Sequence, residues 1–230
     1  MNILDLLFPR RCVSCGRIGK YICVRCSSII QIIELNQQVC PVCERPAVNG
    51  VTHPKCQTAY SLDGLTSFFV YDGPIKKAIK KLKYKFVRDL VSELISLAFL
   101  KGSTLYKVEP WQETILTPVP LHWRRMAWRG FNQSEVLGKL IAQKLNIQFV
   151  SDLLIRKKYT QPQVKLKGKE RKENIQGAFI INPHYPKLAI SHWELIIFDD
   201  VWTTGATLKT CGKVLKEAGA KKVWGMTLAR

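Results

Sequence analysis

The sequence has no run of eighteen or more apolar residues, which argues against a membrane-spanning helix. It is also poor in acids, because 17 Asp and Glu stand against 36 Lys and Arg and give a formal net charge of +19. This excess favours a polyanionic partner, such as nucleic acid, a phosphorylated ligand or an anionic membrane surface. The apolar stretch at residues 3–8 is too short for a secretory signal peptide and is interrupted by Asp5, so we expect a cytoplasmic protein.

Cysteine is nearly absent from most of the chain, yet seven of the eight cysteines lie between residues 12 and 56. A reducing cytosol disfavours disulfides, and paired ligands separated by two residues suit a tetrahedral zinc ion. A segment this small also needs the stability that metal binding supplies. We therefore predict two structural zinc sites, with the ligands Cys12, Cys15, Cys23, Cys26, Cys40, Cys43, His53 and Cys56.

The spacing leaves two ligand pairings open. In the sequential form, residues 12–26 hold one ion and residues 40–56 hold the other, whereas in a cross-brace the first knuckle pairs with the third. Short spacers favour the sequential form. A redox-active pair is the alternative to zinc, but one dithiol would suffice for it and the head lacks a thioredoxin-like βαβ context. We predict a double zinc ribbon over residues 1–60 and a larger domain over residues 61–230.

The larger domain is organised around residues 195–207, LIIFDDVWTTGAT. Its apolar start predicts a buried strand of a parallel sheet, and the following residues predict a helix that ends near Gly219. The fold class expected is α/β, doubly wound, with a mostly parallel sheet. Asp199 and Asp200 then lie at the carboxyl end of a strand, where open α/β sheets bind ligands.

The loop after these acids has the features of an anion site. Backbone N–H groups and the dipole at a helix start favour a negative charge, Gly205 permits close approach, and threonine hydroxyls add donors. Carboxylates beside such a loop suit a sugar phosphate, because they can accept hydrogen bonds from its vicinal hydroxyls. The alternative is a strand–turn–helix with an acidic cap. The predicted phosphate-binding residues are Thr203, Thr204, Gly205, Ala206 and Thr207.

Two basic segments precede this motif. Residues 75–86 predict an amphipathic helix whose lysine face contains no acid, and residues 120–132 predict a basic loop between a strand at 114–119 and a helix at about 134–145. Guanidinium groups on such a loop bind phosphate bidentately. We expect the lysine face to bind single-stranded DNA, and its loss to spare ligand binding at the acids if the two sites are separate; a merely solvated surface is the alternative. The residues predicted to hold a pyrophosphate are Arg124, Arg125, Arg129 and Gly130.

A third basic segment follows a strand expected at residues 148–155. It has little apolar content, so we expect a long mobile loop that closes over the ligand. His122, His184, His192 and Cys211 lack partners at ligand spacing, and we interpret them as packing or surface residues.

Residues 195–207 resemble the 13-residue signature of type I phosphoribosyltransferases, which bind phosphoribosyl pyrophosphate (PRPP) with Mg²⁺. The resemblance implies that Asp199 and Asp200 contact the ribose hydroxyls and act in catalysis. It also implies that the threonine loop holds the 5-phosphate and that the arginine loop holds pyrophosphate. The sequence departs from the usual pattern at Trp202, where a small aliphatic residue is common.

With its cysteine-rich head and the run RRMAWRGFNQ, the whole chain resembles the ComF family of competence proteins. The resemblance implies a zinc ribbon fused to a phosphoribosyltransferase-like domain, acting on single-stranded DNA with other competence proteins in natural transformation. Gln161, Arg171 and Asn174 match positions characteristic of ComF-like chains, in the loop expected to be flexible. Two functions stay open: a Mg²⁺-dependent phosphoribosyltransferase, or a binding module that transfers no group. The acceptor substrate and the oligomeric state are not indicated by the sequence.

Overall fold

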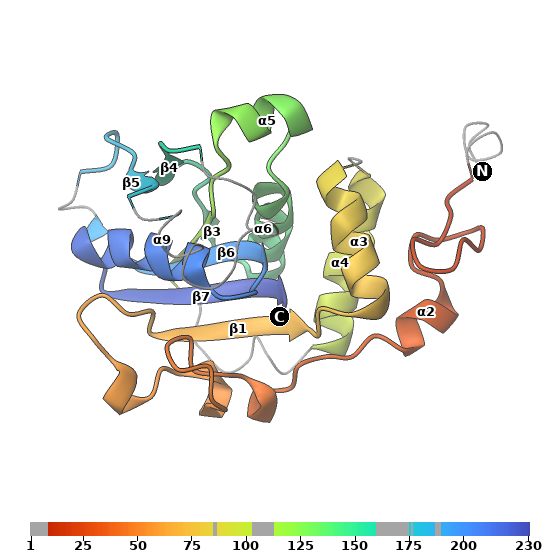
Figure 1. Cartoon of the computed structure of the whole chain (residues 1–230), viewed down its shortest axis with the longest axis horizontal. Helices are drawn as coiled ribbons and strands as arrows, with labels where there is room; N and C mark the ends of the chain where they lie inside the picture. The colour runs from red at the N-terminus through yellow and green to blue at the C-terminus, as the bar shows by residue number, and fades with distance from the viewer. Residues whose placement is uncertain (1–8, 85–86, 103–112, 160–174, 176, 187–189) are drawn as a thin grey trace.

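The computed structural model describes residues 9–84, 87–102, 113–159, 175, 177–186 and 190–230. Its centre is a five-stranded sheet in the order β1-β7-β6-β2-β3 (Figure 1). Every neighbouring pair in this sheet is parallel, which confirms the predicted α/β class. The strands are β1 (Gly64–Phe69), β2 (Thr114–Pro118), β3 (Gln148–Phe149), β6 (Glu194–Val201) and β7 (Lys222–Ala229).

Both faces of the sheet are buried, as a doubly wound fold requires. Along β6, Ile196 and Phe198 join a core built with three helices, α3 (Gly73–Tyr84), α4 (Arg88–Lys101) and α6 (Gln133–Leu145). Leu195 and Ile197 alternate with them and join a second core with α9 (Ala206–Glu217). This explains the continuous apolar run of the strand, since strands covered on both faces have no polar side.

The strand expected over residues 148–155 is instead two strands in different sheets. The edge strand β3 ends at Phe149, and β4 (Leu154–Arg156) pairs antiparallel with β5 (Phe179–Ile181). Polar contacts fix the bend between them, because Asn182 Nδ2 donates to the backbone carbonyl of Asp152 and Tyr185 donates its hydroxyl to the carboxylate. The bend turns β4 away from the main sheet and carries Arg156 with it.

The loop expected at residues 120–132 contains a short helix, α5 (Trp123–Arg129). His122 Nδ1 accepts from the N–H of Arg124 at its start, and Gly130, at φ 77°, closes its end in the left-handed conformation. Local capping rather than burial forms this helix, since none of its residues is buried. Helix α5 could not be predicted from its sequence, WRRMAWR, because this segment has no apolar periodicity.

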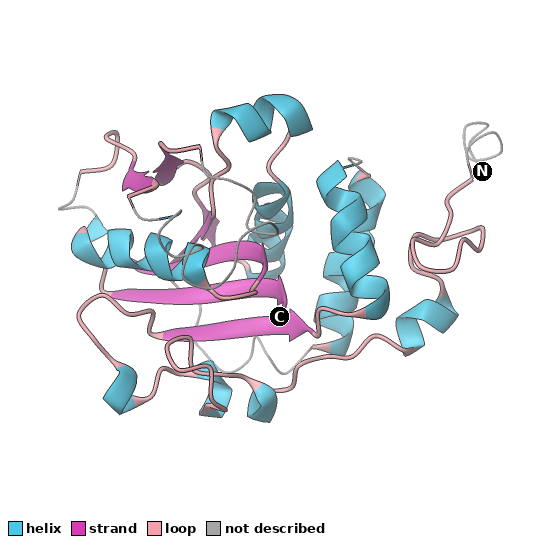
Figure 2. Ribbon diagram, viewed as in Figure 1, coloured by secondary structure: helices cyan, strands magenta, loops and turns pink. Residues whose placement is uncertain are grey.

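The N-terminal head consists of loops and short helices. Its first half lies beside α3 and α4, where Ile22 donates its N–H to Glu93, and its second half runs along the β1 side of the sheet (Figure 2). Its helical elements are α2 (Val24–Ser28), η1 (Leu35–Gln37), η2 (Val48–Gly50) and η3 (Pro54–Cys56). The head covers the open edge of β1. Ile33 donates its N–H to Phe68, and the buried Gln38 side chain both donates to the carbonyl of Ser67 and accepts from its N–H. An edge strand left bare would invite pairing with other chains.

Within the described residues, none of the helices combines the length and the apolar character that crossing a membrane requires.

Candidate functional site

The adjacent strands β2 and β6 form a topological switch point. After β2 the chain leads through α6 to β3 on one side, whereas after β6 it leads through α9 to β7 on the other. Ligands of open α/β sheets bind in the crevice at such a point, outside the carboxyl ends of the strands. A cavity of about 580 Å³ lies there, within the range of small-molecule sites. The predicted acids, the threonine loop and part of the arginine loop meet in this cavity.

The two predicted acids lie near the end of β6 and face this cavity. Asp199 Oδ1 accepts from Ser134 Oγ at 2.9 Å and from the N–H of Asp200 at 2.9 Å. Burial, together with the neighbouring Asp200, raises the pKa of Asp199 to about 6. Ser134 lies in the first turn of α6, where the positive end of the helix dipole favours a nearby carboxylate.

Asp200 is nearly buried and has a cationic partner that the sequence did not indicate. Lys83, from the last turn of α3, places Nζ 2.9 Å from Asp200 Oδ2. Burial opposes the charge of this lysine, but attraction to Asp200, together with smaller effects of Asp199 and Tyr71, outweighs it and raises the pKa of Lys83. Lys76 and Lys80 line the same cavity. Part of the lysine face therefore lies at the same cavity as the acids, because α3 packs beside the strand ends.

The loop after β6 contains a glycine that no other residue can replace without strain. Gly205 has φ 66°, and a Cβ there would overlap the ring of Trp202, which is 3% exposed. Trp202, at the position where a small aliphatic residue is usual, packs beneath the loop in the second core and also lines the cavity. Trp202 at this unusual position therefore forms part of the cavity wall and does not close the cavity. Thr203, Gly205, Ala206 and Thr207 line the cavity, as predicted for a ligand loop, whereas Thr204 does not.

The loop leads directly into the start of α9, whose first N–H groups are available to a ligand. Its N-cap is Gly205, and no side chain caps the helix. Thr204 Oγ1 is buried and makes no hydrogen bond among the described residues. A helix start without a side-chain cap is a ready anion site, because its first N–H groups lack partners within the helix.

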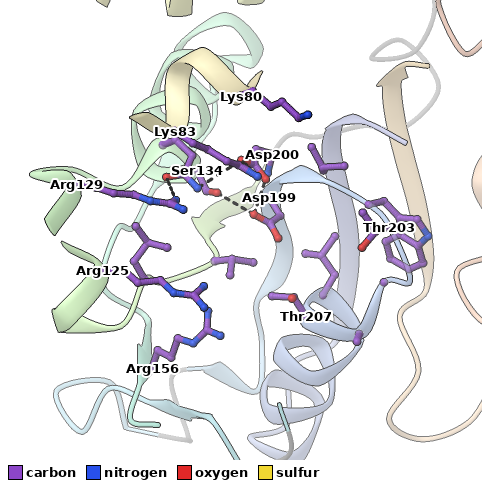
Figure 3. A pocket seen from close by; sticks show the side chains of 18 of the residues that line it. Lys80, Lys83, Arg125, Arg129, Ser134, Arg156, Asp199, Asp200, Thr203 and Thr207 are labelled. Atoms are coloured by element: carbon purple, nitrogen blue, oxygen red, sulfur yellow. Dashed lines mark hydrogen bonds and ion pairs between the residues drawn. The ribbon is translucent and has the colours of Figure 1, made fainter. Parts of the chain in front are cut away.

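Three arginines form the wall opposite the loop (Figure 3). Arg125 and Arg129 line the cavity as predicted, and Arg156 of β4 joins them. Burial lowers the pKa of Arg125, and burial together with Arg125 lowers the pKa of Arg156 to about 10. Burial and like charge destabilise the charged form of these guanidinium groups, so a bound anion would stabilise them strongly. Arg156 was missed as a site residue because only the pairing of β4 with β5 brings it here.

The other predicted members of the arginine set do not line the cavity. Arg124 places its guanidinium 5.3 Å from the ring centroid of Trp123 and 5.4 Å from that of Tyr159. Gly130 ends α5 instead. Gln133, which follows in the sequence motif, links the arginine wall to the acid pair, since its Oε1 accepts from Arg129 at 3.0 Å and its Nε2 lies 3.4 Å from Asp200 Oδ2. Gln161, Arg171 and Asn174 lie outside the described residues.

The cysteine-rich head contains two groups whose ligand atoms lie within 4.8 Å of one another. This arrangement confirms the sequential pairing and excludes the cross-brace. His53 directs Nδ1 toward Cys43 Sγ at 3.4 Å, and its Nε2 lies 3.0 Å from the carbonyl of Pro46, the outer contact typical of a zinc-bound histidine. Four thiolates in one group, and three with an imidazole in the other, fit tetrahedral zinc. The groups are Cys12, Cys15, Cys23 and Cys26, and Cys40, Cys43, His53 and Cys56.

Comparison with known proteins agrees with this architecture. Residues 3–57 match the family described as the double zinc ribbon domain, which defines the head. Over 89% of its length, the chain is 29% identical to the DNA utilization protein YhgH of Escherichia coli K12, of which it covers 89%. It is 29% identical to Competence protein F of Haemophilus influenzae, over 69% of this chain and 70% of that protein. With Competence protein ComFC of Bacillus subtilis it shares 25% identity, over 91% of this chain and 84% of that protein.

The chain is therefore an α/β protein with a double zinc ribbon head. More particularly, its sequence is similar over most of its length to curated proteins named Competence protein F and Competence protein ComFC, in line with the resemblance that its motifs indicated.

Among solved structures, the glutamine PRPP amidotransferase of Bacillus subtilis aligns at a TM-score of 0.40 and 16% identity, over 64% of this chain. The chain spans 30% of that enzyme's length. Similarity at this level does not define the fold, which rests on the parallel sheet and its two covered faces.

Proposed function

We propose that the cavity at the ends of β2 and β6 binds PRPP with Mg²⁺, and that the protein acts on single-stranded DNA in DNA uptake. The observation that carries the proposal is the pairing of opposite charges across one cavity. Asp199 and Asp200 stand at its floor, while Arg125, Arg129 and Arg156 stand on one wall and the threonine loop on the other (Figure 3). A ligand with sugar hydroxyls between two phosphate groups matches this order.

Each part of PRPP has a partner in the proposed complex. The carboxylates of Asp199 and Asp200 accept from the ribose hydroxyls, and the start of α9 holds the 5-phosphate through N–H and hydroxyl groups. The arginine wall holds the pyrophosphate, for which forked guanidinium groups are suited. Mg²⁺ would be held mainly by oxygens of the ligand and water, with the ribose-binding acids nearby, and would supply neutralisation of the pyrophosphate charge.

A transferase would use the same acids in its reaction. When pyrophosphate leaves the anomeric carbon, positive charge develops on the sugar, and a carboxylate beneath the ring stabilises it. The bond from the anomeric carbon to pyrophosphate breaks as a bond to an acceptor nucleophile forms. No side chain of the cavity identifies that acceptor.

A second candidate is a binding module that holds PRPP and transfers no group. The observation that favours it is the lining of the cavity, in whose described residues nothing marks a place for an acceptor of the phosphoribosyl group. In this case the PRPP site would sense a ligand rather than consume it.

The role with DNA is supported by two facts outside the cavity. Curated relatives are named competence and DNA utilization proteins. The chain carries a formal net charge of +19, which is more than a site for one small anion needs.

Calorimetric titration of the zinc-loaded protein with PRPP, with and without Mg²⁺, tests the proposal. We expect saturable binding that weakens when Mg²⁺ is omitted. Release of pyrophosphate in the presence of nucleobases or oligonucleotides would assign the transferase, whereas binding without release would assign the binding module. Absence of PRPP binding in both conditions would contradict the proposal itself.

A further inference from the structure

Helix α5 presents two tryptophans to solvent beside the cavity. The Trp123 side chain is 66% exposed and that of Trp128 is 68% exposed, and α5 buries none of its residues. In Figure 1 this helix stands at the top of the view, apart from the helices that cover the sheet. Large aromatic side chains are costly to expose, so a pair of them on a helix without core contacts indicates a binding surface.

Cations are interleaved with the aromatic rings of this surface. The guanidinium of Arg124 lies 5.3 Å from the ring centroid of Trp123 and 5.4 Å from that of Tyr159, and the guanidinium of Arg125 lies 5.9 Å from the Tyr159 centroid. Tyr159 is 51% exposed, and its ring meets that of His122 edge-on at 5.3 Å. His122 itself is only 4% exposed, so its ring packs against Tyr159 and is not part of the exposed surface.

The same surface is continuous with the cavity. Trp128 and Tyr159 both line it, whereas Trp123 stands outside. Residues 119–131 contain no acid, so nothing in this segment repels a polyanion. Rings that accept bases, combined with guanidinium groups that accept phosphates, are the features of a platform for single-stranded nucleic acid.

We propose that single-stranded nucleic acid binds across the mouth of the cavity, with its bases stacked on Trp123, Trp128 and Tyr159. The placement at this mouth rests on the proposed function, because it sets the strand beside bound PRPP. Tryptophan and arginine also mark protein interfaces, but the local absence of acids and the net charge favour a polyanion. A duplex would hide the faces of its bases, so the platform requires unpaired ones.

The test compares a short oligothymidylate with an abasic strand that has the same number of phosphates. Trp123→Ala should bind the oligothymidylate about tenfold more weakly and the abasic strand unchanged, since one stacking contact is lost. Trp123→Phe should recover most of the affinity. Tyr60→Ala is the matched control: this tyrosine is 50% exposed and lies near Lys213, but does not line the cavity, and its loss should change neither affinity.

PRPP affinity, measured on the same variants, separates this proposal from the proposed function. Trp123→Ala should leave it unchanged, and a failure of the wild type to bind PRPP would overturn only the cavity assignment. An unchanged oligothymidylate affinity in Trp123→Ala would overturn the stacking platform and leave α5 as a surface for a protein partner. Equal weakening for both strands would also overturn it, because charge alone would then explain binding. Thermal unfolding confirms that each variant is folded, which the absence of buried residues in α5 leads us to expect.

Discussion

Lys83 Nζ lies 2.9 Å from Asp200 Oδ2, which joins the end of α3 to the floor of the cavity. The lysine side chain is 25% exposed and the aspartate side chain is 6% exposed, so the pair is largely shielded from water. It balances one of the two adjacent acids in the absence of ligand. A ribose that takes up Asp200 must share this carboxylate with the lysine or displace it.

Replacing Lys83 should therefore separate stability from binding. We expect Lys83→Met to lower the free energy of unfolding by about 1–3 kcal/mol at neutral pH, less than for a fully buried pair because part of Lys83 is exposed. Lys80→Met, on the exposed side of α3, is the control and should change stability little. Chemical denaturation measures both. Equal stability of Lys83→Met and wild type would show that the ion pair contributes nothing.

The raised pKa of Asp199 predicts an unusual pH dependence. Its folded-state pKa is about 6 against an ordinary value of 3.8, so the folded protein binds the proton more tightly than the unfolded chain. The contribution of this acid to stability is therefore greatest below about pH 4 and falls as pH rises to about 6. Asp199→Asn should be more stable than wild type at pH 7, and the difference should disappear near pH 4. A destabilised Asn variant at pH 7 would contradict the burial of an unfavourable charge.

Arg156 should recognise the pyrophosphate and not the sugar. We expect Arg156→Met to weaken PRPP binding about tenfold, because a buried phosphate contact is lost, and to leave ribose 5-phosphate binding unchanged. Arg124→Met is the matched control, since Arg124 does not line the cavity and its loss should affect neither ligand. Isothermal calorimetry with both ligands decides the point. If Arg156→Met weakened both ligands alike, the assignment of the arginine wall to pyrophosphate would be wrong.

The head should contain about two zinc ions per chain, one in each group of four ligands. Cys15→Ser should lose one equivalent and keep the other, because the pairing is sequential. Chelation should also destabilise the sheet, since the head covers the edge of β1 through Ile33 and Gln38. Metal analysis and thermal unfolding with a chelator measure both effects. A stoichiometry near one in wild type would show that one site is not built.

The parts of the site that depend on local pattern were predictable. The acids and the threonine loop followed from residues 195–207, and the zinc ligands followed from their spacing. The positions of Lys83 and Arg156 at the cavity were not predictable, because each residue reaches the cavity through the packing of an element remote in sequence. Trp202 was recognised only as an unusual residue, since its role depends on the positive φ of Gly205 above its ring.

The central claim is that the acid pair at the end of β6 binds PRPP. The most direct measurement is calorimetric titration of the wild type and the double variant Asp199→Asn and Asp200→Asn with PRPP and Mg²⁺, after unfolding curves have shown that both are folded. We predict saturable binding by the wild type and an affinity at least tenfold weaker in the variant, because two acceptors of the ribose hydroxyls are removed. Equal affinity of the two folded proteins would contradict the account.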